Sequence, residues 1–246
     1  LTSYFAGDKI ALATAGARPA AREQQAYLYR MVENLAITAG LPMPKIYLIQ
    51  DSAINAFATG RDPHHASIAV TTGAIEQLQN EELEGVLAHE LSHIGNYDIR
   101  LMTVVIVLVG IVTLLSDFFF RMRFYSGAGA SRREGSRGSN GLLLLVGLVA
   151  LILAPIVGRL IQFAVSRRRE FLADASGALL TRYPDGLARA LEKIAAVNVQ
   201  PMRHAHEATA HLYFSSPFGR AGQRLARLFS THPPVEERIK ALREMA

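Results

Sequence analysis

The chain contains no cysteine among its 246 residues, and this absence excludes both a disulfide framework and a metal site built on thiolates. A transition metal would have to be held by histidine, aspartate or glutamate. The absence of cysteine does not show whether the protein works in an oxidising or a reducing compartment. The sequence begins at Leu1, with no charged segment followed by a short apolar core near its start. We therefore expect no signal peptide within it and interpret the chain as a fragment.

Charged residues are also scarce, at 19% of the chain against 50% hydrophobic residues, an apolar share that is high for a soluble protein. The charge that remains is basic, with a formal net charge of +5. Such a balance suits nucleic acid, an anionic membrane surface or an acidic partner. Nucleic acid is the weakest of these because the arginines cluster beside apolar runs and are not interleaved with aromatic residues. We expect no nucleic-acid partner.

Local periodicity predicts helices and a small sheet in the first part of the chain. Residues 20–39 carry apolar side chains near helical spacing, and the following GLPMP stops that helix. Segments rich in β-branched and aromatic residues predict strands at 45–50, 54–60 and 67–72. A further helix is expected from about residue 81 through His93, with Asn80 as its N-cap and glutamates in its first turn.

Two long apolar runs predict a transmembrane hairpin. Residues 101–120 carry only one charge, Asp117, and at about 1.5 Å per residue they cover roughly 30 Å of hydrocarbon. The second run covers 142–165, and the loop between the runs is rich in glycine, serine and arginine. Arginines lie on both sides of the hairpin, so charge gives no membrane orientation.

The sequence HELSH places His89, Glu90 and His93 in an H-E-x-x-H pattern on the predicted helix. Positions i and i+4 of a helix point the same way, so two imidazoles can bind one zinc ion with the glutamate beside its open coordination position. Zinc lowers the pKa of a bound water, and the carboxylate can take the water's proton as it attacks a carbonyl. The alternative is a solvated helix with incidental histidines.

A catalytic zinc has three protein ligands as a rule, so a third ligand is required. Glu170 is the best candidate because it lies on a predicted helix with Asp174 one turn further on. Asp174 would accept a hydrogen bond from the outer nitrogen of a ligand histidine and so orient it. Taken alone, this acidic pair beside arginines is typical of a surface salt-bridge cluster. The other histidines are expected at the surface. His64 and His65 lie in a loop between strands, and the remaining three lack an acidic companion at ligand spacing: His204, His206 and His211.

The ordered segments of this chain resemble the HtpX family of bacterial membrane-bound zinc peptidases, relatives of the CAAX prenyl endopeptidases. The similar segments are YFAGDKIALATAGAR, NAFATG, HELSHIGNYD, SRRREFLADASGALL and THPPVEERIKAL, with the hydrophobic hairpin between the third and the fourth. The resemblance runs from near residue 4 to about residue 243. The zinc motif alone is shared by many metalloproteases, but the ordered set is specific.

The resemblance implies an α+β fold: a mostly helical, gluzincin-like zincin core with a small β-sheet, an inserted two-helix transmembrane hairpin, and two further membrane helices before residue 1. The expected parts are a first catalytic segment at 1–98, a transmembrane helix at 99–120, a polar loop at 121–141, a transmembrane helix at 142–165 and a second catalytic segment at 166–246. It further implies a multi-pass protein of the bacterial inner membrane with its catalytic domain facing the cytoplasm.

The resemblance also assigns roles to residues. His89, His93 and Glu170 become the ligands of one zinc ion per chain, Glu90 the general base and Asp174 a partner of a ligand histidine. His232 matches a histidine that stabilises an oxyanion, although its spacing fits a plain loop residue equally well. Arg238 either assists at the substrate or faces solvent. Asp98 either caps or orients the end of the zinc helix, or has no function there. The edge strand would contain Asn55, Ala56 and Phe57, along which an extended peptide adds its backbone. Without the resemblance, these residues fit an ordinary short strand.

We therefore predict a membrane-anchored zinc endopeptidase that cleaves membrane or misfolded proteins by Glu-assisted attack of zinc-bound water, in membrane protein quality control. Its partners would be polypeptide substrates and the lipid bilayer. The alternative is a membrane-anchored scaffold or binding protein with a structural zinc and no turnover. The intact Glu90 argues against that alternative because a structural site needs no general base. Substrate identity, cleavage preference and oligomeric state do not follow from the sequence.

Overall fold

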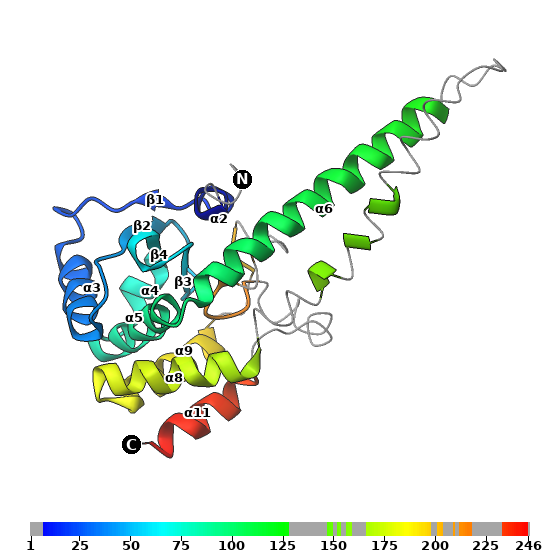
Figure 1. The fold of residues 1–246 in the computed structure, drawn as a ribbon. Helices are drawn as coiled ribbons and strands as arrows, with labels where there is room; N and C mark the ends of the chain where they lie inside the picture. Colours follow the sequence, from blue (N-terminus) through cyan, green and yellow to red (C-terminus); the bar gives the residue numbers. More distant parts are fainter. Residues whose placement is uncertain are drawn as a thin grey trace.

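The structure is a computed structural model that describes residues 7–127, 147–149, 152–153, 156–158, 166–197, 201–203, 209, 212–217 and 233–245. Within these ranges the chain is mostly helical with a small mixed sheet (Figure 1). The helices are α2 (Gly7–Thr14), α3 (Ala26–Ala39), η1 (Pro63–His65), α4 (Thr72–Gln77), α5 (Asn80–Gly95), α6 (Asp98–Gly127), α8 (Arg167–Thr181), α9 (Pro184–Val197) and α11 (Val235–Arg243). The strands are β1 (Arg18–Pro19), β2 (Lys45–Ile49), β3 (Ala56–Gly60) and β4 (Ala66–Thr71).

The four-stranded sheet has the order β1-β2-β4-β3, so β3 lies at one edge. β2 and β4 run parallel, whereas β1 and β3 are antiparallel to their neighbours. The tight connection from β3 to β4 requires a glycine at position 60. Gly60 has φ +143°, and a Cβ there would lie only 2.3 Å from the carbonyl oxygen of His65.

Helix α5 forms the centre of the fold. It contacts β3 and α3 on the sheet side, and it contacts α8 and α9 on the other side, while α11 packs on α8 and α9 (Figure 1). Leu87, Leu91 and Ile94 of α5 are buried in the main hydrophobic core together with Ile68 and Val70 of β4. An almost fully buried helix thus carries the HELSH motif, which keeps the motif away from bulk water.

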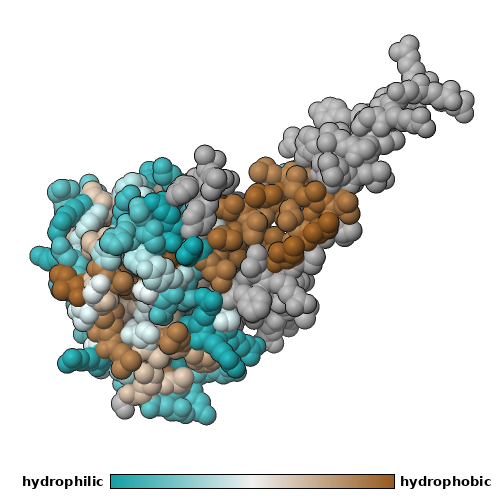
Figure 2. Space-filling view, in the orientation of Figure 1, coloured by the Kyte–Doolittle hydropathy of each residue, from teal (hydrophilic) through white to brown (hydrophobic). Residues whose placement is uncertain are grey.

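Helix α6 begins beside the core and projects far beyond it (Figure 1). Its base is buried against α2, in a second apolar cluster that includes Met102, Val105 and Ile106. Beyond this base, the part of α6 that is not grey in Figure 2 presents apolar side chains. Among the described residues, α6 alone is long and apolar enough to cross a membrane; its window Asp98–Leu115 has a mean hydropathy of 2.3. Most of the predicted second span, 142–165, falls outside the described ranges.

The strand bounds differ from the expected ones by one or two residues, and two helix starts differ as well. The helix predicted over 20–39 begins only at Ala26, because the preceding residues pair with β2: Arg18 lies opposite Leu48, and Ala20 donates to the Ile46 carbonyl. The prediction of Asn80 as N-cap is wrong. Gln79 is the N-cap of α5, and its N–H donates to the Glu82 carboxylate at 2.8 Å, the three-residue spacing of a capping box.

Candidate metal centre

His89 and His93 lie one turn apart on α5 and project into the same buried space. Their Nε2 atoms are 3.1 Å apart, and the two side chains are almost inaccessible to solvent. A hydrogen bond between these two atoms would require one Nε2 atom to carry a proton. A shared cation, in contrast, would be bound by both nitrogen atoms. The geometry of the pair is therefore that of two ligands facing one position.

Helix α8 brings Glu170 to the same position. The helix packs closely against α5, and a Cβ on Gly177 would already lie 3.0 Å from the backbone nitrogen of His89. Glu170 is 1% exposed, with Oε1 3.6 Å from His93 Nε2 and Oε2 3.9 Å from His89 Nε2. One ligand atom from each of the three residues lies within 4.8 Å of the others.

These distances fit a divalent ion. Ligand atoms placed about 2.1 Å from a tetrahedral zinc ion are roughly 3.4 Å apart, and the observed separations bracket that value. The donor set of two imidazoles and one carboxylate, without thiolates, matches a catalytic site with three protein ligands. Among the described residues, this is the group of histidine and acidic side chains whose geometry could hold a metal ion.

The outer nitrogen of His89 is held by a buried ion pair. Its Nδ1 lies 2.9 Å from Asp174 Oδ1. Arg238, from α11, donates to both oxygens of Asp174, with Nε at 2.8 Å from Oδ2 and Nη2 at 2.7 Å from Oδ1. Burial raises the pKa of Asp174, but the charge and hydrogen bonds of Arg238 outweigh it and hold the pKa at about 2. Asp174 is thus kept as a carboxylate that orients His89.

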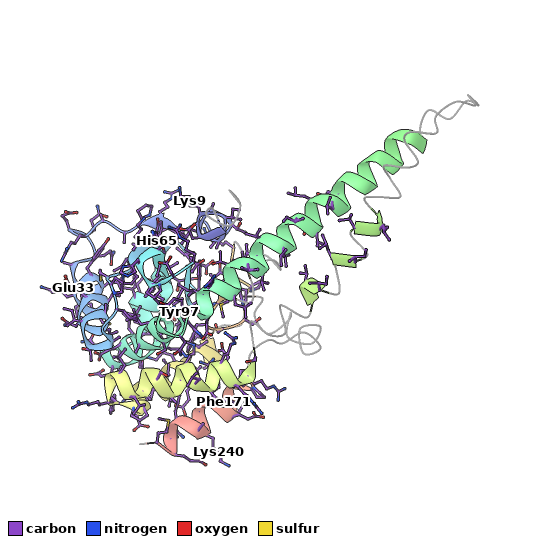
Figure 3. All side chains as sticks on the ribbon, viewed as in Figure 1. Lys9, Glu33, His65, Tyr97, Phe171 and Lys240 are labelled. Carbon is purple, nitrogen blue, oxygen red and sulfur yellow. The ribbon has the colours of Figure 1, made fainter. Side chains whose placement is uncertain are left out.

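His93 is held in the same way at the start of α6. Its Nδ1 lies 3.0 Å from Asp98 Oδ2, and the other oxygen of Asp98 accepts a hydrogen bond from Arg169. Tyr97, labelled in Figure 3, lies in the turn between α5 and α6 and adopts a left-handed conformation, with φ +60°. Asp98 therefore contacts both His93 and Arg169, a position from which it could orient the imidazole.

Glu90 lies beside this centre and is 1% exposed. Burial raises the pKa of Glu90 to about 7, and the charge of Glu170 acts in the same direction, while His93 and the Ala58 N–H oppose the shift. Burial also lowers the pKa of His89 to about 4. It acts to lower the pKa of His93 as well, but the hydrogen bond to Asp98 and the charges of Glu170 and Glu90 raise it to about 9. Protonation is thus favoured at Glu90 and His93 and disfavoured at His89.

The structure also locates the remaining predicted residues. Ala56 and Phe57 belong to edge strand β3, which Asn55 immediately precedes. Arg238 does not face solvent: it is 2% exposed and lies behind the imidazole of His89, paired with Asp174. His232 lies outside the described residues.

Of the other histidines, His64 and His65 are exposed in η1, where His65 pairs with Asp62 at 2.8 Å (Figure 3). The remaining ones lie outside the described ranges: His204, His206 and His211. Sequence reasoning missed Arg169 and Phe214. Arg169 belongs to a run of three arginines that gives no reason to choose one, and the ring of Phe214, 4.8 Å from that of His89, belongs to a segment with no recognisable pattern.

Comparisons with known proteins agree with this geometry. Residues 22–246 match the model of peptidase family M48. The protease HtpX homolog of Thermoanaerobacter pseudethanolicus is 51% identical over 245 residues, which cover 99% of this chain and 80% of the relative. That of Streptococcus gordonii is 44% identical over 247 residues, covering 100% of this chain and 82% of the relative.

The fold is also found in a crystal structure of Ste24p from S. mikatae, with a TM-score of 0.51 and 22% identity. The superposition covers 87% of this chain and 49% of Ste24p. At this identity the likeness concerns the fold alone. The family match and the curated relatives decide the family: this chain belongs to peptidase family M48, which confirms the relationship predicted from its ordered motifs.

Proposed function

We propose that this chain is a membrane-anchored zinc endopeptidase that binds one zinc ion through His89, His93 and Glu170. The observation that carries the proposal is the convergence of these three buried side chains, with their ligand atoms within 4.8 Å of one another. When bound, zinc supplies a Lewis acid that polarises a peptide carbonyl and makes water more acidic. Polypeptides are the substrates that a peptidase family implies.

Glu90 is the general base of this proposal. It is buried beside the centre, and the Ala58 N–H donates a hydrogen bond to its carboxylate. A carboxyl group whose pKa lies near neutrality can accept a proton from water and return it to the leaving amine. The reaction then needs no covalent enzyme intermediate. His232 would stabilise the oxyanion, a role that rests on the family resemblance.

The substrate is proposed to bind as an added strand at the outer edge of β3, near Asn55, Ala56 and Phe57. Main-chain hydrogen bonds are common to all peptides, so this mode accepts varied sequences. We propose that Arg238 contributes by positioning Asp174 and His89, since it is buried behind them.

The location proposed is the bacterial inner membrane. Helix α6 crosses the bilayer as the first half of a transmembrane hairpin whose second half covers 142–165, and the catalytic domain faces the cytoplasm. Support comes from the apolar length of α6 and from the membrane-bound family that the motifs resemble. Because α6 starts at Asp98, five residues after His93, the active site lies at the membrane surface. Membrane or misfolded proteins are substrates that would be met there.

The test is cleavage of an unfolded model protein by the full chain in lipid vesicles. We expect turnover that a chelator abolishes and added zinc restores. Glu90→Gln should lose at least about 100-fold in rate, since a general base contributes on that order, while binding one zinc ion per chain in metal analysis. Glu81→Gln is the matched control because Glu81 is exposed on the same helix. Retained turnover in Glu90→Gln would refute the assignment, as would turnover that survives removal of the metal.

A further inference from the structure

Residues 212–215, here named the strap, lie against the outer edge of β3. In the antiparallel β3–β4 pair, successive residues point their backbone groups alternately toward and away from the neighbouring strand. Thr71 N–H donates to the Asn55 carbonyl, so position 55 faces β4 and Ala56 faces outward, as do Ala58 and Gly60. These outward groups are the ones that an added peptide strand would have to meet.

The strap already pairs with this edge through its main chain. Phe214 N–H donates to the Ala56 carbonyl at 2.8 Å. The side-chain amide of Asn55 binds the next residue at two points: Nδ2 donates to the Ser215 carbonyl at 2.9 Å, and Ser215 N–H donates to Oδ1 at 3.1 Å. Two successive residues of the strap are therefore held through the backbone groups that every peptide possesses.

The rest of the outer edge is occupied as well. Ala58 N–H donates to the carboxylate of Glu90, and the Gly60 carbonyl accepts a hydrogen bond from Thr103 of α6 at 2.7 Å. Because one edge position can pair with only one strand, a substrate that adds to β3 at Ala56 competes directly with the strap.

The side chain of Phe214 reaches the metal centre. Its ring packs edge-on against the imidazole of His89, with centroids 4.8 Å apart at 85°, and the guanidinium carbon of Arg238 lies 4.8 Å from the ring centroid. Tyr213, the preceding residue, packs edge-on against Phe57 at 5.1 Å. The strap is bent, yet it donates a main-chain hydrogen bond to the edge strand and places an aromatic ring beside a candidate ligand histidine. A substrate residue next to the cleaved bond would have to bind at this same place.

We propose that the strap is a pseudosubstrate: it fills the place of the substrate strand, a substrate must displace it, and the pocket that holds Phe214 accepts an aromatic or large aliphatic residue adjoining the cleaved bond. This inference rests on the proposed function. The pocket favours such a side chain because an aromatic ring gains from the edge-on contact with the imidazole of His89 and from the contact with the guanidinium of Arg238.

The first test weakens the strap without touching the catalytic residues. Ser215→Pro removes the N–H that donates to Asn55, and a peptide then competes with a strap that has lost one hydrogen bond. For a ten-residue peptide with one central phenylalanine, we expect KM to fall about 2- to 10-fold with kcat unchanged. Ser216→Pro is the matched control: within the described part of the chain its backbone N–H has no partner, so KM should stay at the wild-type value.

The second test needs no strap variant and no turnover. In zinc-loaded Glu90→Gln, which binds peptide without cleaving it, hydrogen exchange of the Phe214 amide should become at least 10-fold faster when the peptide saturates the protein. The Leu83 amide, bonded inside α5, should not change. Exchange at Phe214 that stays the same or slows with peptide bound would overturn the pseudosubstrate.

The two proposals fail in different ways. If wild type, Ser215→Pro and Ser216→Pro all cleave no faster than Glu90→Gln, the proposed function itself is wrong. If all three cleave with the same KM and the Phe214 amide stays protected, only the pseudosubstrate is wrong. The pocket has its own readout: sites cut in a denatured protein should be enriched in Phe, Tyr or Leu at one fixed position beside the cleaved bond, and an even distribution would refute that preference.

Discussion

At the scale of single residues, each ligand imidazole is held by a carboxylate that is itself held by an arginine. Asp174 and Arg238 hold His89, whereas Asp98 and Arg169 hold His93. Such partners fix which ring nitrogen carries the proton and leave the other free for a metal. The two arrangements differ in burial, because the side chain of Arg238 is 2% exposed and that of Arg169 is 35% exposed.

Removal of Arg238 should therefore be costly. Arg238→Met leaves the Asp174 carboxylate buried without its cation, and breaking a buried pair in this way costs about 3–5 kcal/mol. We also expect zinc affinity to fall about 10- to 100-fold as His89 loses its orientation. Arg243→Met is the control on the same helix, because its pair with Glu192 is exposed and contributes at most about 1 kcal/mol. Unfolding in denaturant measures the loss of stability, and competitive zinc titration measures the loss of zinc affinity. Equal losses in Arg238→Met and Arg243→Met would contradict the expectation.

Asp98→Asn tests the second imidazole. The amide keeps the shape of the carboxylate but removes the charge that attracts the His93 Nδ1–H and Arg169, so zinc affinity should fall about 10- to 100-fold. Asp117→Asn removes a charge from an exposed position on the same helix and should leave zinc affinity unchanged. A zinc titration in which both variants match the wild type would leave Asp98 with a capping role alone.

The sequence predicts part of this centre and not the rest, for a physical reason. Spacing on one helix places His89 and His93 on a common face, and the same rule places Glu170 and Asp174 together, so local patterns were sufficient for these pairs. Arg238 meets Asp174 from 64 residues away, and no local pattern records such a contact. For this reason the sequence alone could not decide whether Arg238 faces solvent or the site.

At the scale of elements, the site depends on how closely α8 approaches α5. Gly177 makes the approach possible, since a Cβ there would lie 3.0 Å from the His89 nitrogen and 3.2 Å from its Cα. The neighbouring atoms belong to the backbone of a buried helix and cannot turn aside as a flexible side chain can. The distance between Glu170 and the two imidazoles is set by this contact.

Gly177→Ala should thus move the helices apart. The strain of overpacking, about 1–3 kcal/mol, exceeds the gain of about 1 kcal/mol from replacing a helical glycine, and zinc affinity should fall as Glu170 retreats. Gly95→Ala is the control at the end of α5, because its Cβ would meet only Leu41 at an ordinary 3.5 Å. Denaturation and zinc titration measure the two effects. If Gly177→Ala bound zinc as tightly as Gly95→Ala, the close approach would not govern the site.

The elements themselves were largely predictable, since the strands at 45–49, 56–60 and 66–71 and the zinc helix follow their local patterns. The misses concern their ends. Residues 20–25 have helical spacing, but pairing of the preceding segment with β2 delays the helix, a tertiary effect that outweighs local propensity. The contact between the strap and the edge of β3 could not be predicted for the same reason, because Ser215 lies 160 residues beyond Asn55 in the chain.

At the scale of the whole molecule, the buried candidate metal centre and a projecting apolar helix meet at Asp98. On the face seen in Figure 2, the body presents mainly polar side chains, whereas the described part of α6 beyond its base presents apolar ones. A helix of 30 residues spans about 45 Å, more than the roughly 30 Å hydrocarbon core of a bilayer. In water the apolar surface of α6 would stay exposed, whereas in a bilayer the lipid would cover it.

Leu114→Arg tests whether lipid surrounds this helix. Leu114 is 71% exposed near the middle of α6, where replacing leucine by arginine in a membrane-spanning helix costs about 3 kcal/mol of insertion free energy. Leu179→Arg is the matched control, because Leu179 is also 71% exposed but lies on α8 in the body. After alkaline extraction of membranes, Leu114→Arg should release a larger soluble fraction than wild type, and Leu179→Arg should not. Equal retention of the two variants in the membrane would mean that lipid does not surround α6 at this position. An arginine exposed to hydrocarbon would weaken insertion, and the two variants would then differ.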